Sequence, residues 1–199
     1  MKTPKKVGEP TELCPRVFGK TAVNQKFVSP SGEEYGYLLW DYKNGEPPVI
    51  VIALTENLKV VAIKQYRHAA DEVVTEVPGG CLIKNQTLEE AVREELLQET
   101  GFEAEKVDKL NRKPTWFEPS NLTVPYHAYL ARGCKKVAEP KLDKTEHIEL
   151  VVVDWFEWLR MIDGGEVCDS KTIVLTFLAM LKDMRLAYKF AQFCDVLPY

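Results

Sequence analysis

The amino-acid sequence predicts a mixed α+β fold, in which helices cover a mixed β-sheet as an α/β/α sandwich. A run of β-rich segments comes first, one strongly helical stretch follows, and further strands precede helices towards the C-terminus. This order is neither a regular alternation of strands and helices nor a purely β pattern, and it is typical of α+β or sandwich domains. With 199 residues, of which 45% are hydrophobic, the chain is long enough for one well-buried core.

The stretch before residue 80 is predicted to consist of strands. Between Gln25 and Asp41, two apolar stretches flank the turn sequence Pro30-Ser31-Gly32, which indicates an N-terminal antiparallel β-hairpin. Three β-rich segments follow, at residues 49–54, 60–65 and 73–77. Because they are short and separated by turn-forming residues, we expect them to be neighbouring strands of one sheet.

Residues 87–100 give the clearest helix prediction. Thr87-Leu88-Glu89-Glu90 has the form of an N-terminal capping box, and Gly101 is a typical C-terminal stop. Downstream, the pattern predicts strands at 126–132 and 148–153 and helices at 155–162 and 171–181, whereas 188–199 matches no element. We expect three regions: an N-terminal β-strand extension over 1–45, one main domain over 46–185 and a C-terminal tail over 186–199.

Composition and charge argue against several classes of protein. The net charge of -4 and the lack of a dense Lys/Arg block argue against a nucleic-acid partner. Residues 1–10 are polar, and no apolar run reaches the length of a membrane span, so we expect no membrane partner and a cytoplasmic location. The cysteines are odd in number, widely spaced and without a C-x-x-C pair: Cys14, Cys81, Cys134, Cys168 and Cys194. They favour neither a disulfide framework nor a zinc site.

The predicted helix carries two carboxylates on its apolar side. At about 100° per residue, Glu95 and Glu99 fall about 20° either side of Leu88. The apolar stripe beside them consists of Ala91, Val92 and Leu96. Two buried carboxylates repel each other and lose hydration, so they need a cation or raised pKa values, and a divalent metal ion satisfies both. The alternative is a rotated helix, with Leu97 in the core and both glutamates at its solvated edge.

Residues 80–102 resemble the Nudix box, G-x5-E-x7-R-E-U-x-E-E-x-G-U, in which U is a bulky apolar residue. The positions that match are Gly80, Glu95, Leu96, Glu99, Gly101 and Phe102. The resemblance implies a Nudix-type α/β/α sandwich whose helical glutamates hold Mg²⁺ or Mn²⁺ on the diphosphate of a nucleoside diphosphate linked to another group. Water then attacks phosphorus. The preceding Pro78-Gly79-Gly80 allows a tight turn, so the Gly79 carbonyl is a third candidate metal ligand beside Glu95 and Glu99.

Three positions of the box depart from the pattern. Gln86 replaces the first glutamate, Glu94 replaces the arginine, and Gln98 replaces the first of the paired glutamates. The family's first glutamate and its arginine usually pair with each other, so their joint loss leaves no orphaned charge, and a Gln86 amide can donate a hydrogen bond to Glu94. An amide oxygen at Gln98 brings no negative charge to a divalent ion, so we expect weaker metal binding or one metal fewer.

Motifs before the box resemble the ADP-ribose pyrophosphatase branch of the family. Gln65-Tyr66-Arg67 is similar to its Q-Y-R element, and Glu76-Val77-Pro78-Gly79-Gly80 to its E-x-P-A-G element, with Gly79 in place of alanine. The resemblance assigns Arg67 to phosphate oxygens, for which a planar guanidinium is suited, and places Glu76 in substrate binding. Without the resemblance, Arg67 is a solvated arginine at the end of a strand.

Motifs after the box extend the resemblance to roughly residues 17–181. The acidic stretch 142–149 is similar to the loop that carries a late metal ligand or general base, and Glu146 is the candidate for that role. Residues 164–172 are similar to the segment before the last helix, whereas 118–123 match the family's loop poorly. Relatives in this branch dimerise through N-terminal strands and stack the base on aromatic residues there, for which Tyr37 and Phe27 are candidates. For the remaining aromatic positions, ordinary packing is the stronger interpretation: His127, Trp116, Trp155 and Trp158.

Three functions remain open from the sequence. The first is a hydrolase that splits a nucleoside diphosphate sugar into a nucleoside monophosphate and a sugar phosphate, with Glu95, Glu99 and Glu146 as catalytic residues and Arg67, Glu76 and Tyr37 as substrate-binding residues. The second is a nucleotide-sugar binding module that has kept the fold and lost the chemistry. The third is a structural or protein-interaction domain without affinity for nucleotides. The resemblance to the ADP-ribose pyrophosphatase branch also implies a homodimer.

Overall fold

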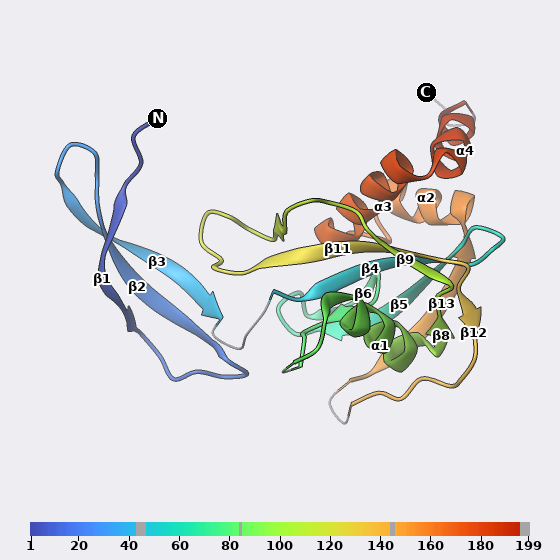
Figure 1. The fold of residues 1–199 in the computed structure, drawn as a ribbon, viewed down its shortest axis with the longest axis horizontal. Helices are drawn as coiled ribbons and strands as arrows, with labels where there is room; N and C mark the ends of the chain where they lie inside the picture. Colours follow the sequence, from blue (N-terminus) through green and yellow to red (C-terminus); the bar gives the residue numbers. More distant parts are fainter. Residues whose placement is uncertain (43–46, 84, 144–145, 196–199) are drawn as a thin grey trace. The chain divides into compact units, whose positions relative to one another are not determined.

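The computed structural model describes residues 1–42, 47–83, 85–143 and 146–195 (Figure 1). The chain forms two compact units. The N-terminal unit consists of Met1–Pro47 with Trp116–Tyr126, and the main unit consists of Pro48–Thr115 with His127–Tyr199. The N-terminal unit thus includes a later segment that the predicted boundary at residue 45 leaves in the main domain.

The N-terminal unit is built on a three-stranded antiparallel sheet. Its strands are β1 (Lys5–Glu12), β2 (Lys20–Val28) and β3 (Glu34–Tyr42), in the order β1-β2-β3. The predicted hairpin is β2 and β3, whose turn is closed by a hydrogen bond from the Ser29 amide to the Glu33 carbonyl at 2.8 Å. The sequence does not predict β1, because its residues are polar and mostly exposed and show no apolar alternation.

Segment 116–126 joins this sheet through its backbone. The Trp40 amide donates to the Asn121 carbonyl at 2.7 Å, and the Thr123 amide donates to the Trp40 carbonyl at 3.0 Å. The Thr123 hydroxyl also donates to the Asp41 carboxylate at 3.1 Å. Pairing between residues some 80 positions apart leaves no local pattern, which explains why the sequence assigns this segment to the main domain.

A mixed sheet forms the centre of the main unit. Strand β11 (Pro125–Arg132) runs parallel to β4 (Val49–Leu54), and β4 runs antiparallel to β5 (Lys59–Arg67). Beyond β5 lies β13 (Ile148–Asp154), also antiparallel. The shorter strands at its edges are β6 (Glu72–Glu76), β7 (Gly79–Gly80), β9 (Lys106–Lys109) and β10 (Thr115–Trp116). A separate pair consists of β8 (Phe102–Glu103) and β12 (Lys135–Lys136).

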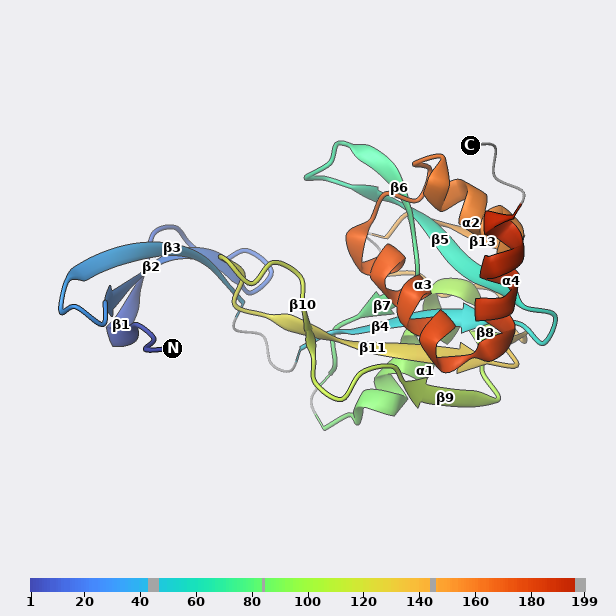
Figure 2. The same ribbon diagram turned by 90° about the horizontal axis from the view of Figure 1, so that it is seen from above.

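Helices cover both faces of this sheet, which confirms the predicted sandwich. Helix α1 (Leu88–Thr100) lies on one face, and α2 (Trp155–Asp163), α3 (Ser170–Lys182) and α4 (Met184–Cys194) lie on the other (Figure 1; Figure 2 shows the same layers from above). Under α1, the apolar stripe of the helix packs on alternate residues of β4 and β5: Val49, Val51, Ala53 and Val61. None of the helices in the part of the chain that the structure describes has the length and apolar character needed to cross a membrane.

The opposite layer is anchored by two tryptophans of α2. Trp155 and Trp158 are fully buried, as the packing interpretation predicts. The Trp158 Nε1 donates to the Thr176 hydroxyl of α3 at 3.0 Å, so its polar atom is satisfied inside the core. This hydrogen bond fixes α2 against α3, and α3 in turn reaches the site described below.

Helix α4 corrects the tail predicted over 186–199. The segment is helical to Cys194, and its Leu186 and Phe193 are buried, while residues 196–199 lie outside the described part of the chain. Asp183 caps the helix by accepting the Arg185 amide at 3.0 Å. Its apolar residues recur at helical spacing, at Leu186, Phe190 and Phe193, so the sequence carries a helical period that the predicted tail overlooks.

Leu186 tests whether α4 is an integral layer of the fold. Replacing this fully buried side chain in Leu186→Ala is expected to lower the free energy of unfolding by about 2–5 kcal/mol, because it leaves a cavity under the helix. Tyr188→Ala on the same helix is the control, because Tyr188 is 67% exposed. Urea unfolding measures both, and equal, small losses would contradict the packing described.

Candidate active site

Helix α1 is held at both ends by local hydrogen bonds. The Thr87 hydroxyl accepts the Glu90 amide at 3.3 Å, and the Glu90 carboxylate accepts the Thr87 amide at 2.8 Å, which confirms the capping box. At the other end, Gly101 has a φ of +75° and its amide donates to the Leu97 carbonyl at 2.8 Å. These caps fix where the helix starts and stops, and so fix which of its residues face the sheet.

Two glutamates of α1 turn towards the glycine pair of β7. The Glu99 side chain is only 4% exposed, and its Oε2 accepts the Gly79 amide at 2.9 Å. The half-buried Glu95 carboxyl lies against the Cα of Gly80. The rotated-helix alternative is therefore wrong: Leu96 is fully buried, and Leu97 lies only partly in the core.

Both glutamates have strongly raised pKa values. Burial raises the pKa of Glu99 to about 8, against the lowering effect of the Gly79 hydrogen bond, and the charges of Glu95, Glu146 and Glu76 raise it further. Burial also raises the pKa of Glu95 to about 7, with contributions from Glu146, Glu94 and Asp143. Ionising this pair at neutral pH is costly unless positive charge is supplied.

A buried ion-pair network lies beside the pair. The Glu76 carboxylate is 1% exposed and contacts the Arg67 Nη2 and the Lys171 Nζ, each at 2.6 Å. Lys171 also lies 2.8 Å from Asp169, the residue that caps α3. Arg67 is 44% exposed, so part of its guanidinium remains available to a ligand while Glu76 holds it in place.

Sequence reasoning missed Lys171. The only local signal is that it follows the capping residue Asp169 at the start of α3, and nothing in the sequence links it to Glu76. Thr172 is tied to the same region, because its hydroxyl accepts the Val77 amide at 3.0 Å. The start of α3 thus supports the short segment between β6 and the glycine pair.

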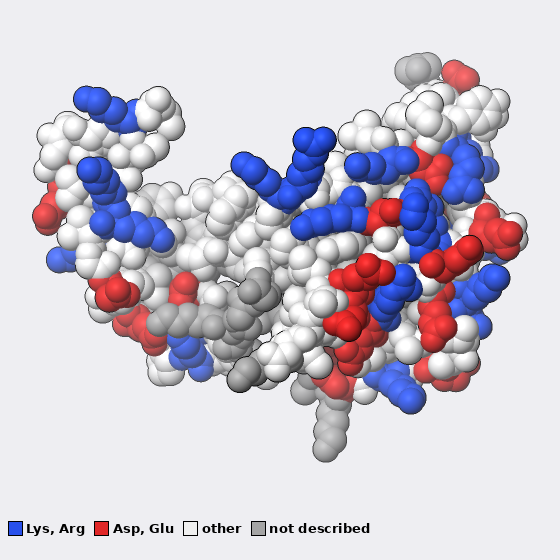
Figure 3. Space-filling model, viewed as in Figure 1, with Lys and Arg blue, Asp and Glu red and all other residues white. Residues whose placement is uncertain are grey.

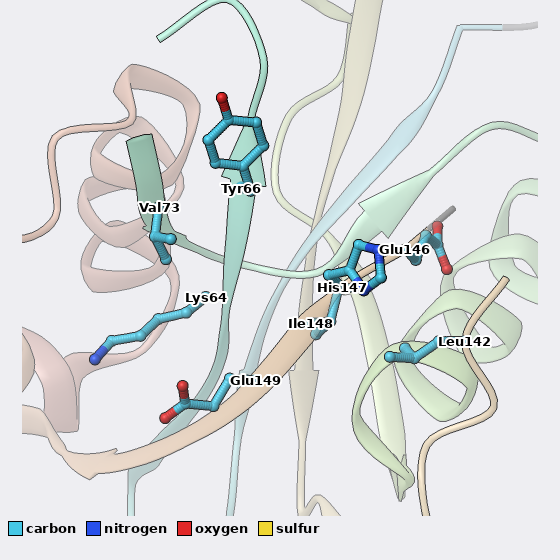
Figure 4. Close-up of a pocket in the computed structure, with 8 residues that line it drawn as sticks. All are labelled: Lys64, Tyr66, Val73, Leu142, Glu146, His147, Ile148 and Glu149. Carbon is cyan, nitrogen blue, oxygen red and sulfur yellow. The ribbon is translucent and has the colours of Figure 1, made fainter. Parts of the chain in front are cut away.

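Glu146 reaches the pair from the loop before β13. Its amide donates to the Asp143 carbonyl at 2.9 Å, and its carboxylate accepts the Asp143 amide at 3.0 Å; Lys144 and Thr145 between them lie outside the described residues. Figure 4 shows the Glu146 carboxylate pointing towards α1. Its charge acts on both Glu95 and Glu99, so three carboxylates from two distant segments share one region.

Comparison with known proteins agrees with this geometry. Residues 44–172 match the family model of the NUDIX domain. This chain belongs to the Nudix family. Among its relatives, the ADP-ribose pyrophosphatase of Bacillus subtilis is 30% identical over 142 residues, which are 71% of this chain and 76% of that protein.

Other relatives carry other names. The methanol dehydrogenase activator of Bacillus methanolicus is 32% identical over 68% of this chain and 72% of its own length. The GDP-mannose pyrophosphatase of Yersinia enterocolitica is 29% identical over 70% of this chain and 76% of its own. The solved structure of an ADP compounds hydrolase superimposes with a TM-score of 0.77 at 16% identity, covering 90% of this chain and 94% of that one, which confirms the Nudix fold.

The three departures from the Nudix box form one hydrogen-bonded cluster. The Gln86 Nε2 donates to the Glu94 Oε2 at 2.5 Å, and the Gln98 Nε2 donates to the Glu94 Oε1 at 2.9 Å. The other end of the Gln86 amide accepts the Ile83 amide at 3.1 Å, so the loop before α1 stays tied to the helix. The predicted bond from Gln86 to Glu94 is confirmed, and Gln98 joins it from one helical turn away.

The glycines of β7 allow the close approach of the carboxylates. A Cβ at Gly80 would collide with the Glu95 carboxyl, which is the free end of a flexible side chain. A Cβ at Gly79 would come 2.9 Å from the Ile50 Cα and closer still to the Val49 carbonyl oxygen, both of which are backbone. The alanine of the E-x-P-A-G element therefore does not fit at residue 79 in this arrangement.

The oxygen atoms of the site suit a hard divalent cation, although they do not form a complete metal site as they stand. Among the described residues, no three acidic, histidine or cysteine side chains lie close enough together to hold an ion as they stand. The carboxylates of Glu95 and Glu99 nevertheless share a buried region with Glu146, and carboxylate and carbonyl oxygens are the ligands that magnesium and manganese prefer.

The two aromatic residues expected to stack on the base lie in the N-terminal unit. Phe27 stacks on Tyr35 with ring centroids 5.8 Å apart, and Tyr37 meets Phe27 edge to face at 6.4 Å. These rings line a cavity of about 380 Å³, together with Trp116 and Leu122 from the later segment. Trp116, expected to be packed, is half exposed at this cavity, whereas His127 is buried in β11, in accordance with its packing interpretation.

Alanine substitutions at the two glycines separate function from folding. Gly80→Ala is expected to displace the Glu95 carboxyl and lower hydrolytic activity at least tenfold, with an almost unchanged melting temperature. Gly79→Ala must move backbone and is expected to lose about 1–3 kcal/mol of stability. Thermal unfolding and activity are measured on both; a Gly80→Ala protein with full activity would contradict the role of this contact.

The Glu94 cluster is tested by a double-mutant cycle. Gln98→Glu removes a donor and places two carboxylates four residues apart on α1, so we expect a loss of about 1 kcal/mol of stability. In a Glu94→Arg background the same change creates an ion pair and is expected to stabilise. The cycle should give a coupling of at least about 0.5 kcal/mol in urea unfolding, and additive effects would show that the residues act separately.

Proposed function

We propose that this chain hydrolyses the diphosphate bond of nucleoside diphosphate sugars with the help of Mg²⁺ or Mn²⁺. The products are a nucleoside monophosphate and a sugar phosphate. One observation carries the proposal: the buried Glu99 and the half-buried Glu95, both with raised pKa values, turn towards the glycines of β7. The names of the pyrophosphatase relatives, for ADP-ribose and GDP-mannose, support the substrate class.

Each residue has a role in this proposal. Glu95, Glu99 and the Gly79 carbonyl would hold the cation, which when bound would offset the charge of the diphosphate and activate water. Arg67, held by Glu76, donates hydrogen bonds to phosphate oxygens. Glu146 takes the proton of the attacking water as the new P–O bond forms, and the bond between phosphorus and the bridging oxygen breaks.

The proposal extends to the assembly of the protein and its location. We infer a homodimer formed through the N-terminal strands, because β3 exposes large apolar side chains: Tyr35, Tyr37, Leu38 and Trp40. Tyr37 would then stack on the base of the substrate. In the main unit, acidic and basic side chains are interspersed on the face shown in Figure 3, which favours a small ligand over a polyanion. We also propose a cytoplasmic location.

A second candidate is a nucleotide-sugar binding module without turnover. The observation in its favour is that the Gln98 amide points its nitrogen at Glu94, so this position supplies neither charge nor an oxygen directed at a metal. The retained Glu95, Glu99 and Arg67 favour the enzyme.

Product analysis decides between these candidates. With Mg²⁺ or Mn²⁺, the wild-type protein is expected to release AMP from ADP-ribose or GMP from GDP-mannose, and Glu99→Gln to lower kcat by at least about 100-fold. Glu103→Gln, an exposed carboxylate on β8, is the control. Calorimetry that shows tight, metal-independent binding, with intact ligand recovered afterwards, would instead identify the binding module.

A further inference from the structure

A groove with both polar and apolar side chains opens between β5, β6 and the start of β13 in the main unit. Its volume is about 440 Å³, within the range of about 300–1,000 Å³ that small-molecule pockets occupy. The side chains that line it come from these three strands and from the loop of Glu146, and Figure 4 shows them: Lys64, Tyr66, Val73, Leu142, Glu146, His147, Ile148 and Glu149.

The groove holds unused donors and acceptors. Lys64 on β5 lies directly opposite Glu149 on β13 in the strand register. Within the described ranges, neither of them nor His147 makes a side-chain hydrogen bond or an ion pair. A cationic donor and an anionic acceptor side by side suit a ligand that carries several hydroxyl groups, since each hydroxyl both donates and accepts.

The groove also presents one fixed aromatic ring. The Tyr66 hydroxyl donates to the Asp71 carboxylate at 2.5 Å, and its ring meets His68 edge to face at 5.2 Å, so the ring is held while 41% of the residue stays exposed. Beside it, Val73 and Ile148 add apolar surface. A ring flanked by polar groups offers a contact for the carbon face of a sugar.

Glu146 is the residue that the groove has in common with the surroundings of the acidic pair. This residue lines the groove, and its charge also raises the pKa of both Glu95 and Glu99. A ligand with its diphosphate at the acidic pair therefore has a neighbouring groove for one of its two halves. The hydroxyl-rich half fits the paired charges of the groove better than a flat base, for which only one ring is present.

We propose that this groove binds the sugar half of the substrate, with Lys64 and Glu149 on its hydroxyl groups and the Tyr66 ring against its carbon face. The inference rests on the proposed function, because it takes the diphosphate to lie at Glu95 and Glu99. It makes Lys64 and Glu149 specificity-determining residues that act on binding and not on the bond-breaking step.

The test uses Lys64→Met and Glu149→Gln, with Lys59→Met as the matched control. Lys59 is an exposed lysine on the same strand, likewise opposite an acid of β13, and lies outside the groove. In the wild-type protein, ribose 5-phosphate and AMP are both assayed as inhibitors of ADP-ribose hydrolysis. Each groove variant is expected to raise the inhibition constant of ribose 5-phosphate and the KM for ADP-ribose about tenfold, the effect of one charge-assisted hydrogen bond.

The inhibition constant of AMP and the kcat should stay within about twofold of wild type, because the lost contacts act on binding alone. Groove variants that behave like Lys59→Met would overturn the inference while leaving the hydrolase proposal intact. If the wild-type protein turns nothing over, the proposed function fails, and calorimetry with ADP-ribose then decides the groove separately. Weaker binding by Lys64→Met than by Lys59→Met would support it, and equal affinities would overturn it.

Discussion

The hydrogen bond from the Gly79 amide to the Glu99 carboxylate is the contact on which the site depends. It joins α1 to β7 across 20 positions of the chain and holds a carboxylate almost fully out of water. One N–H cannot replace the hydration of a carboxylate, so the pKa of Glu99 stays raised to about 8 despite it. Ionising Glu99 beside Glu95 is therefore unfavourable in this fold, and a divalent cation on the diphosphate would offset the negative charge.

The three altered positions of the Nudix box act together in the structure, although along the chain they look like separate losses. Taken singly, Gln86, Glu94 and Gln98 each remove a charged group of the Nudix box. In the structure, both amides donate to the single carboxylate of Glu94, so the cluster still ties the loop to the helix without an arginine. Of the three departures, only Gln98 is expected to weaken metal binding. Its amide donates to Glu94, and the site has one carboxylate fewer for the metal.

Local chemistry explains what the sequence could predict. The bounds of α1 follow from Thr87 and Gly101, and the burial of Glu99 follows from helical periodicity. The contacts that could not be predicted join distant residues: Lys171 meets Glu76 across 95 positions, and Thr123 meets Asp41 across 82. Helix α4 differs from these contacts, because the helical spacing of Leu186, Phe190 and Phe193 is a local signal that the predicted tail overlooks.

The pH dependence of stability without metal tests the central claim most directly. An acid whose pKa rises from 4.5 to about 8 on folding binds more protons folded than unfolded, so stability falls as the pH rises through that window. In the presence of a metal chelator, the melting temperature of the wild-type protein minus that of Glu99→Gln should therefore fall between pH 5 and about pH 8. Added Mn²⁺ should raise the melting temperature of the wild-type protein again, but not that of the variant. A difference that stays constant with pH and ignores Mn²⁺ would contradict a buried, cation-dependent carboxylate at Glu99.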